Sequence, residues 1–222
     1  MKPRIDHLVI GAQTLEQGVA YVKETLGVEM PFGGVHVQMG THNHLMRLGP
    51  DSFLEVLAID PEATPPASPR WYGLDDPFVR RRIERRPALL AWVVNTDDIG
   101  ALVKQASISL GSPELLRRGR LSWYFGVPDD GRLLAGGMLP YVIQWLADAH
   151  PAANMADGGC RLRSLEIYHP FPSWLEAVLG SIGASDLVKL HALPPNEVPF
   201  LKAEITTPGG EKILDSQSGQ AD

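Results

Sequence analysis

The sequence has a single cysteine, Cys160, among 222 residues, so no disulfide bond can form within the chain. Such low cysteine use is typical of proteins from a reducing compartment. No run of apolar residues reaches the length of about eighteen that a membrane-spanning helix needs, and the N-terminus lacks the basic-then-apolar pattern of a secretory signal. We therefore expect a cytoplasmic protein that has no membrane partner.

Positive charge is also scarce, because 20 lysines and arginines face 26 acidic residues and the net charge is −6. Proteins that bind the phosphate backbone need the opposite balance, so we expect no nucleic acid partner. Arginines do cluster between residues 80 and 86, but Glu84 lies among them and Asp75 and Asp76 precede them. A charge run of this kind favours a solvent-facing helix surface over an anion site.

The common catalytic motifs of fixed spacing are missing. There is no Walker loop, no Cys-x-x-Cys and no Gly-x-Ser-x-Gly, and the glycine runs are not followed by helices as a dinucleotide site requires. Composition is that of an ordinary globular protein, with 44% hydrophobic and 21% charged residues.

What the sequence does contain is one pattern in three copies. Each copy is an apolar strand, a short polar turn, an amphipathic helix and then Leu-Gly or Ile-Gly. The strands are residues 5–10, 89–94 and 162–168, and the copies end at Gly27, Gly111 and Gly183. The distance from strand to glycine is about 22 residues each time, which indicates an internal repeat.

Further strands complete each copy, so the sequence predicts an α+β fold of three β-α-β-β-β units. The first unit spans residues 1–60, with a helix after Thr14 and strands at 35–39, 44–48 and 53–59; Gly40 to Asn43 is read as a turn. The second spans 88–147 and the third 161–215. Residues 61–87 form a proline-rich connector, 148–160 a linker and 216–222 a polar, frayed tail.

This organisation resembles the vicinal oxygen chelate superfamily, which includes glyoxalase I, bleomycin-resistance proteins and extradiol dioxygenases, and most closely its glyoxalase-like branch. The resemblance is carried by the runs Ile5-Asp6-His7-Leu8-Val9, Gly33-Gly34-Val35-His36, Gly40-Thr41-His42-Asn43, Phe53-Leu54-Glu55, Leu139 to Trp145 and Glu166 to Pro170. It implies that two units pair into a curled mixed-sheet cleft. It also implies that the first and last strand of each unit supply one ligand to a divalent metal.

Two residues of the first unit occupy these ligand positions, His7 on the first strand and Glu55 on the last. Both types suit zinc, iron, manganese or nickel. In the second unit Ala91, which cannot ligate, stands where His7 would be, and Gln144 aligns with Glu55. The predicted metal set is therefore His7, Glu55 and Gln144; a His7–Glu55 pair without metal stays an open alternative.

Other candidate site residues follow the first helix and surround Gln144. His36 is assigned as a catalytic base, although a ligand or a turn-stabilising role remains open. Asn43, Trp123 and Gln144 are assigned to substrate binding. Because Gln144 and Trp145 are adjacent on a strand, at most one of them reaches the cleft.

Two functions follow from these assignments. The first is a metal-assisted enzyme, a lyase, isomerase or dioxygenase, acting on a small oxygenated substrate. The second is a metal-free protein that binds a small molecule in the same cleft, as bleomycin-resistance proteins sequester theirs. The unpaired third unit packs alongside the others or forms a homodimer.

Overall fold

The computed structural model describes residues 2–217, in which the first two units share one eight-stranded sheet. The strand order is β2-β3-β4-β1-β5-β8-β7-β6. The strands of the first unit are β1 (Arg4–Gly11), β2 (Phe32–His36), β3 (Thr41–Gly49) and β4 (Ser52–Ile59), and those of the second are β5 (Ala88–Asn95), β6 (Ser112–Arg118), β7 (Leu121–Val127) and β8 (Tyr141–Trp145).

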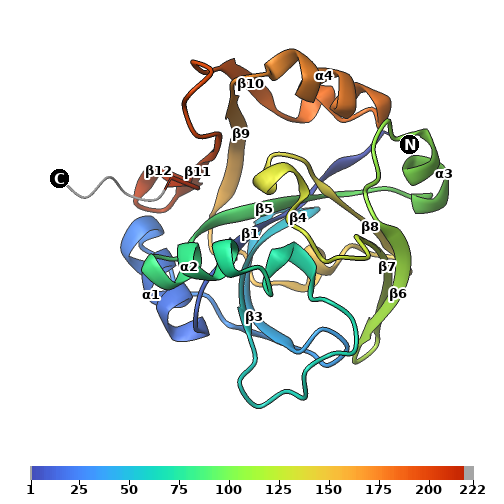
Figure 1. The fold of residues 1–222 in the computed structure, drawn as a ribbon. Coiled ribbons are helices and arrows are strands. Elements are labelled where there is room, and N and C mark those ends of the chain that lie inside the picture. Colours follow the sequence, from blue (N-terminus) through green and yellow to red (C-terminus); the bar gives the residue numbers. More distant parts are fainter. Residues whose placement is uncertain (1, 218–222) are drawn as a thin grey trace.

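The two units meet where β1 pairs antiparallel with β5, with Leu8 opposite Trp92. Within each unit the first strand runs parallel to the last, β1 with β4 and β5 with β8. The sheet curls so that its two halves face each other as a half-barrel (Figure 1). Its far edges are linked by Gln38, whose side chain accepts from the Arg117 amide at 3.0 Å and donates to the Leu115 carbonyl at 3.4 Å. The predicted fold class, with two units paired in a curled mixed sheet, is confirmed.

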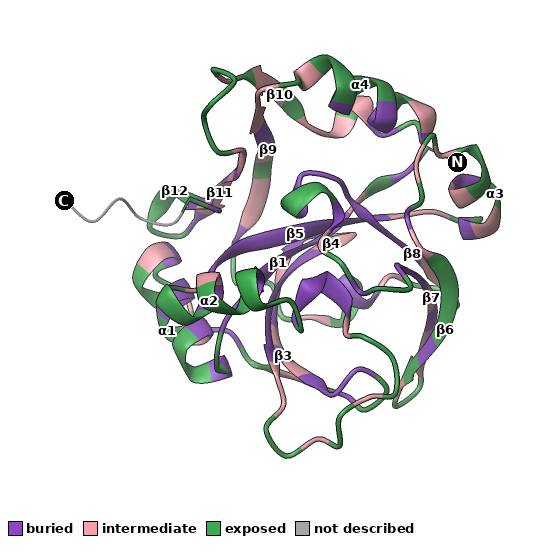
Figure 2. Cartoon of the chain, viewed as in Figure 1, coloured by how far each residue is buried: buried purple, intermediate pink, exposed green. Residues whose placement is uncertain are grey.

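The central strands of this sheet are buried on both faces. Residues 8–10 of β1 and 89–94 of β5 have almost no exposed surface, which explains why they read as continuous apolar runs rather than alternating ones. Figure 2 shows the buried residues concentrated on β1, β4 and β5. A single apolar core extends from these strands into all three units.

The helices are α1 (Leu15–Leu26), α2 (Pro77–Arg85), α3 (Ile99–Gln105) and α4 (Pro172–Ser181), and short 3₁₀ turns lie at 71–73, 134–137, 151–154 and 185–187. The boundaries predicted for α1 are confirmed: the Thr14 hydroxyl accepts from the Gln17 amide, and Gly27 ends the helix at φ 72°. The structure corrects the turn predicted at 40–43, because β3 already begins at Thr41. His36 and Asn43 therefore lie on paired strands.

Glycine at position 18 of α1 is required by close packing against β4. A Cβ there would lie 2.3 Å from Val56 Cγ1, whereas a Cβ on Gly100 of α3 would meet only Asp98 Oδ1 at 3.5 Å. We expect Gly18→Ala to lower the free energy of unfolding by about 1–3 kcal/mol through overpacking, despite the better helix propensity of alanine. Gly100→Ala is the matched control and should stabilise slightly. Urea unfolding of both variants tests this, and equal effects would contradict it.

The third unit has the predicted order of elements but its own sheet. Its strands are β9 (Arg161–His169), β10 (Lys189–Ala192), β11 (Phe200–Thr207) and β12 (Gly210–Asp215), with α4 after β9, and they pair in the order β10-β9-β11-β12. Here the first strand is internal, parallel to β10 and antiparallel to β11. Because both edges of β9 are occupied, it cannot join another unit as β1 joins β5. The cleft therefore belongs to the first and second units.

The predicted polar tail begins one residue later than expected. Ser216 is buried, its hydroxyl accepts from the Leu201 amide at 2.7 Å, and its carbonyl accepts from Arg82 at 2.7 Å. Residues 218–222 of the predicted tail lie outside the described residues. Across residues 2–217, none of the helices has the length and apolar character needed to cross a membrane.

Candidate active site

The concave side of the half-barrel contains a pocket with an empty volume of about 340 Å³, counted out to its open mouth. Both units and the connector line it. Its lining residues are His7, His36, Asn43, Leu45, Phe53, Glu55, Trp71, Tyr72, Arg118, Trp123, Phe125, Ile143 and Trp145. An aromatic wall with a few converging polar groups is the usual character of a small-molecule site.

His7 is held at the base of this pocket by its neighbour Asp6. The pairing of β1 with β5 shifts register between Ile5 and His7, and this bulge lets two adjacent side chains approach each other. His7 Nδ1 lies 2.6 Å from Asp6 Oδ1. Because an ionised carboxylate only accepts, Nδ1 carries the proton, and the lone pair of Nε2 faces the pocket.

Asp6 is a fully buried carboxylate that receives three further hydrogen bonds. Its Oδ2 accepts from Trp145 Nε1 at 2.8 Å, from Asn95 Nδ2 at 3.3 Å and from His150 Nε2 at 2.9 Å. His150 Nδ1 accepts from the Ala152 amide, which leaves the ring proton on Nε2. Burial alone would raise the pKa of Asp6, but hydrogen bonds from His150 and His7 outweigh it and hold this pKa well below its usual range.

Glu55 approaches the other nitrogen of His7. Glu55 Oε2 lies 3.6 Å from His7 Nε2, and its Oε1 accepts from Asn43 Nδ2 at 2.6 Å. The carboxylate is only 4% exposed, in register with Val9 on β1. His7 is thus placed between two carboxylates, one fixing its orientation and one beside its free lone pair.

Tyr72 reaches the same nitrogen from the connector, with its hydroxyl 3.4 Å from His7 Nε2. Its backbone has a φ of 58°, a left-handed conformation that is rare for a bulky side chain and that recurs at functional sites. Burial, followed by the nearby Glu55 charge, raises the pKa of Tyr72 well above its ordinary value. The hydroxyl therefore stays protonated and can donate.

His36 lies in the pocket but has its own set of partners. Its Nδ1 is 3.1 Å from Thr41 Oγ1, and its Nε2 is 3.3 Å from Arg118 Nη1 and 3.5 Å from Asn43 Nδ2. Burial and then the Arg118 charge lower the pKa of His36 to about 3. The imidazole is neutral at physiological pH, and so low a pKa makes it a weak base, which disfavours His36 for that role.

The pKa of His36 makes stability fall in mild acid. The unfolded chain protonates this ring below its ordinary pKa of about 6.5, whereas the folded chain does so only near pH 3. Between these limits the unfolded state holds one proton more, so we expect the free energy of unfolding to fall by about 1.4 kcal/mol for each pH unit of acidification. The slope of the free energy of unfolding against pH, measured by urea unfolding across this window, should be shallower for His36→Gln than for the wild type. An identical slope would contradict the assignment.

Comparisons with known proteins identify the family and the fold. A family model described as a glyoxalase-like domain matches residues 5–181. The chain belongs to this family. The resemblance that the sequence analysis draws to the vicinal oxygen chelate superfamily is thereby confirmed.

Solved structures share the fold of this glyoxalase-like protein at low identity. A hypothetical protein from Staphylococcus aureus is 14% identical, with a TM-score of 0.57 over 100% of this chain and 88% of that one. A triple mutant of 4-hydroxymandelate synthase from Streptomyces coelicolor is 16% identical, with a TM-score of 0.52 over 98% of this chain and 64% of that one. No curated protein matches. At these identities the likeness shows the fold alone.

The structure corrects the placement of Gln144, which the sequence analysis aligns with Glu55. Gln144 Oε1 accepts from the Ile99 amide at the start of α3, at 3.0 Å, and the side chain is not part of the pocket wall. Its neighbours Ile143 and Trp145 line the pocket instead. The pairing of β8 with β5 sets Tyr141 opposite Val93, as Glu55 is set opposite Val9 in the first unit, so Gln144 is not the equivalent of Glu55. It lies on the other face of the strand from Ile143 and Trp145.

These placements test whether the residues fit the divalent metal that the family implies. His7 Nε2 and Glu55 Oε2 are close enough to face one ion. The second unit adds no ligand to the pocket wall, because its lining residues are Arg118, Trp123, Phe125, Ile143 and Trp145. Among residues 2–217, no three His, Cys, Asp or Glu side chains are placed so that they could hold one metal ion. Two such ligands are one fewer than a catalytic zinc site uses, so the donor set does not fit.

Of the predicted site residues, His7, His36, Asn43, Glu55 and Trp123 line one pocket, and Gln144 does not. The sequence analysis does not assign Asp6, Tyr72, Arg118, Trp145 or His150 to the site. Asp6 is quoted there only as the neighbour of His7, and strand alternation places adjacent side chains on opposite faces. Tyr72 comes from the irregular connector and His150 from the linker, where no periodic pattern marks a functional residue.

Proposed function

We propose that this glyoxalase-like protein is an enzyme of the isomerase or lyase class. It would remove a proton from the carbon next to a carbonyl group of a small oxygenated substrate and return one. The observation that carries the proposal is His7 between two carboxylates, with Asp6 2.6 Å from Nδ1 and Glu55 3.6 Å from Nε2. Asp6 holds the tautomer whose lone pair faces the pocket. This is the arrangement of an oriented general base.

In the proposed step, His7 Nε2 accepts the proton of the carbon adjacent to the carbonyl. The electron pair of the broken C–H bond moves to form a carbon–carbon double bond, and the carbonyl electrons move onto oxygen as an enolate. The imidazolium of His7 is stabilised by the charges of Asp6 and Glu55. Return of a proton from His7 to the same carbon, on either face, restores the carbonyl with no net change in protons. When His7 exchanges its proton with the solvent before this return, the carbon acquires a solvent proton.

Two other groups support this step. The Tyr72 hydroxyl, protonated and 3.4 Å from His7 Nε2, is placed to donate to the enolate oxygen. The aromatic wall formed by Trp123, Phe125 and Trp145 restricts water and strengthens the electrostatic contacts. The predicted roles of Asn43 and His36 become positional, because Asn43 holds Glu55 and His36 contacts Arg118.

Deuterium incorporation tests this function directly. The protein is incubated in D₂O with small aldehydes, ketones and 2-oxo acids, and exchange at the carbon beside the carbonyl is followed by proton NMR. We expect exchange with members of one substrate class, well above the rate without protein. If no compound exchanges faster than with denatured protein, the proposal is overturned.

The predicted metal-assisted enzyme is the second candidate. Its support is the His7–Glu55 spacing together with Asp6 on the far nitrogen of His7, because a carboxylate commonly orients a histidine ligand in this way. Zinc, iron, manganese and nickel remain the ions to test. The donor set above supplies two protein ligands, so no step of the mechanism is derived through a metal.

The predicted binding protein without catalysis is supported by the largely aromatic wall that the second unit gives to the pocket, with Trp123, Phe125 and Trp145. It predicts ligand binding with no deuterium exchange, which separates it from the enzyme. A cytoplasmic location and a homodimer also stay predictions, and light scattering tests the dimer.

A further inference from the structure

Arg118 lies at the end of β6, where the curled sheet brings the second unit close to the first. It is half-buried and lines the pocket. Its side chain passes close to Gly34 of β2, where a Cβ would lie 3.1 Å from Arg118 Cδ. Gly34 also has a φ of 145°, so a larger residue would be strained there and would push the arginine away.

The contacts of this guanidinium are with neutral groups. Nη1 donates to Asn43 Oδ1 at 3.2 Å and lies 3.3 Å from His36 Nε2. Within residues 2–217 it forms no ion pair, whereas Arg70, Arg132 and Arg161 each have an aspartate partner. Burial lowers the pKa of Arg118, and the Glu55 charge on the far side of Asn43 opposes this effect. Because none of the described carboxylates contacts the guanidinium directly, a bound anion would further offset the cost of burial.

The unused donors of Arg118 suit a carboxylate. A guanidinium carries five N–H groups in a planar fork, and in the described chain only those on Nη1 have protein acceptors. A fork of this kind binds planar carboxylates through two parallel hydrogen bonds. The rest of the pocket wall is largely aromatic and aliphatic, so it fits the apolar remainder of a small molecule.

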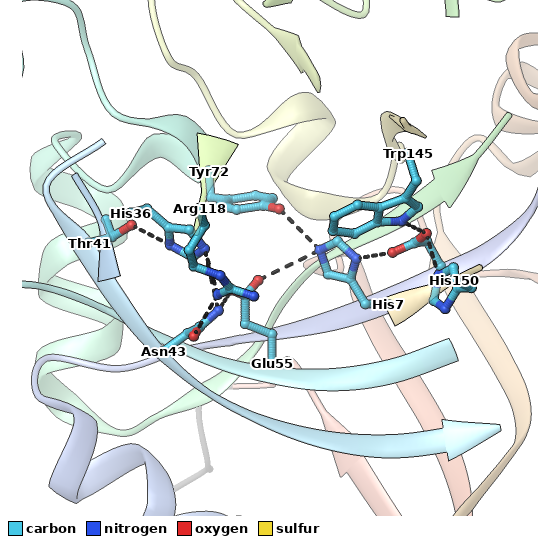
Figure 3. Close-up of polar contacts among 10 residues, drawn as sticks. His7, His36, Thr41, Asn43, Glu55, Tyr72, Arg118, Trp145 and His150 are labelled. Carbon is cyan, nitrogen blue, oxygen red and sulfur yellow. Dashed lines mark hydrogen bonds and ion pairs between the residues drawn. The ribbon is translucent and has the colours of Figure 1, made fainter. Parts of the chain in front are cut away.

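Asn43 connects Arg118 to Glu55, the carboxylate beside His7, through two hydrogen bonds. Its Oδ1 accepts from Arg118 and its Nδ2 donates to Glu55 Oε1 at 2.6 Å (Figure 3). One amide therefore fixes the distance between the guanidinium and the carboxylate beside His7. A ligand held at Arg118 lies in the same pocket as His7 and Glu55.

We infer that Arg118 is the substrate's anion anchor and that the substrate class is a small carboxylate with an apolar remainder. This inference names the substrate of the proposed enzyme and in that sense rests on the proposed function. Arg118 is assigned a binding role, and the proton is moved by His7.

Direct binding separates this inference from catalysis. Acetate, butyrate and phenylacetate are each titrated beside their primary amides and inorganic phosphate, with calorimetry or tryptophan fluorescence as readout. Trp71, Trp123 and Trp145 line the pocket and report its occupation. We expect at least one carboxylate to bind, and Arg118→Met to weaken it by about 10-fold to 100-fold, the range for a charge-assisted contact. The amides should bind weakly to both proteins.

Arg120→Met is the matched control, because Arg120 is exposed two residues further along the same hairpin. It should leave affinity unchanged. The inference is overturned if no carboxylate binds at about 10 mM, if Arg118→Met binds as tightly as wild type, or if phosphate binds in preference to carboxylates. Arg118-dependent binding without deuterium exchange would leave the anion anchor standing and remove the enzyme proposal. Deuterium exchange that does not depend on Arg118 would leave the enzyme proposal standing and remove the anion anchor.

Discussion

His7→Gln is expected to lower the rate of deuterium exchange by about 100-fold to 10,000-fold, the usual contribution of a positioned general base. Glutamine resembles the imidazole in size and can keep a hydrogen bond to Asp6, but it has no basic nitrogen. The stacking of His7 on Phe53, with ring centroids 4.5 Å apart, is the main packing contact put at risk. The loss should therefore be in the rate of the bound complex more than in substrate affinity.

Two comparisons make this result specific. Glu55→Gln removes the charge beside Nε2 while leaving an oxygen near Asn43, so we expect a smaller loss in rate. His169→Gln changes a histidine that lies on β9 and accepts from the Phe171 amide, outside the pocket, and it should exchange at the wild-type rate. Wild-type exchange by His7→Gln would show that another group removes the proton.

Asp6→Asn is expected to be the most destabilising single substitution at the site, lowering the free energy of unfolding by about 3–5 kcal/mol. The carboxylate accepts from four donors, on His7, Asn95, Trp145 and His150. A carboxamide keeps one acceptor oxygen and turns an NH₂ group toward donors. Buried N–H groups would then lack partners, and the links from β1 to β8 and to the 151–154 turn would be lost.

Urea unfolding followed by fluorescence measures this effect, since Trp145 is one of the donors. Asp186→Asn provides the control, because Asp186 pairs with Lys2 in a bridge whose two side chains are each 83% exposed. That variant should unfold at the wild-type urea concentration. A loss below about 1 kcal/mol for Asp6→Asn would mean that the four donors find other partners.

Much of the fold follows from periodicity. Thr14 and Gly27 mark the ends of α1, and the recurrence of strand, helix and Gly identifies three units. That two of them pair is what the family resemblance implies, and the sequence does not tell which two. The third unit shows the limit of that reasoning. Its elements follow the same order, but nothing in the local pattern of β9 tells which edges will be bonded. Sheet pairing depends on non-local contacts that a repeat does not specify.

The sequence predicts only the part of the site that the first unit supplies. His7 and Glu55 stand out as polar residues within apolar strands, and burial without partners would be costly, so a shared site is a sound expectation. Gln144 illustrates the weakness, because an alignment carried through turns of different length loses the register of the last strand and with it the face of each side chain. Asp6 needs a bulge, and Arg118 needs the curl of the whole sheet. Neither is encoded in the spacing of nearby residues.

In the proposed mechanism His7, flanked by Asp6 and Glu55, moves the proton without a metal ion. The most direct test is deuterium exchange by one protein sample before and after dialysis against a strong chelator, with elemental analysis of both halves. We expect the sample to exchange deuterium at the same rate before and after dialysis, and we expect the His7→Gln variant to show no such exchange. Exchange that disappears with the metal and returns with zinc, iron, manganese or nickel would contradict it and assign His7 and Glu55 as ligands.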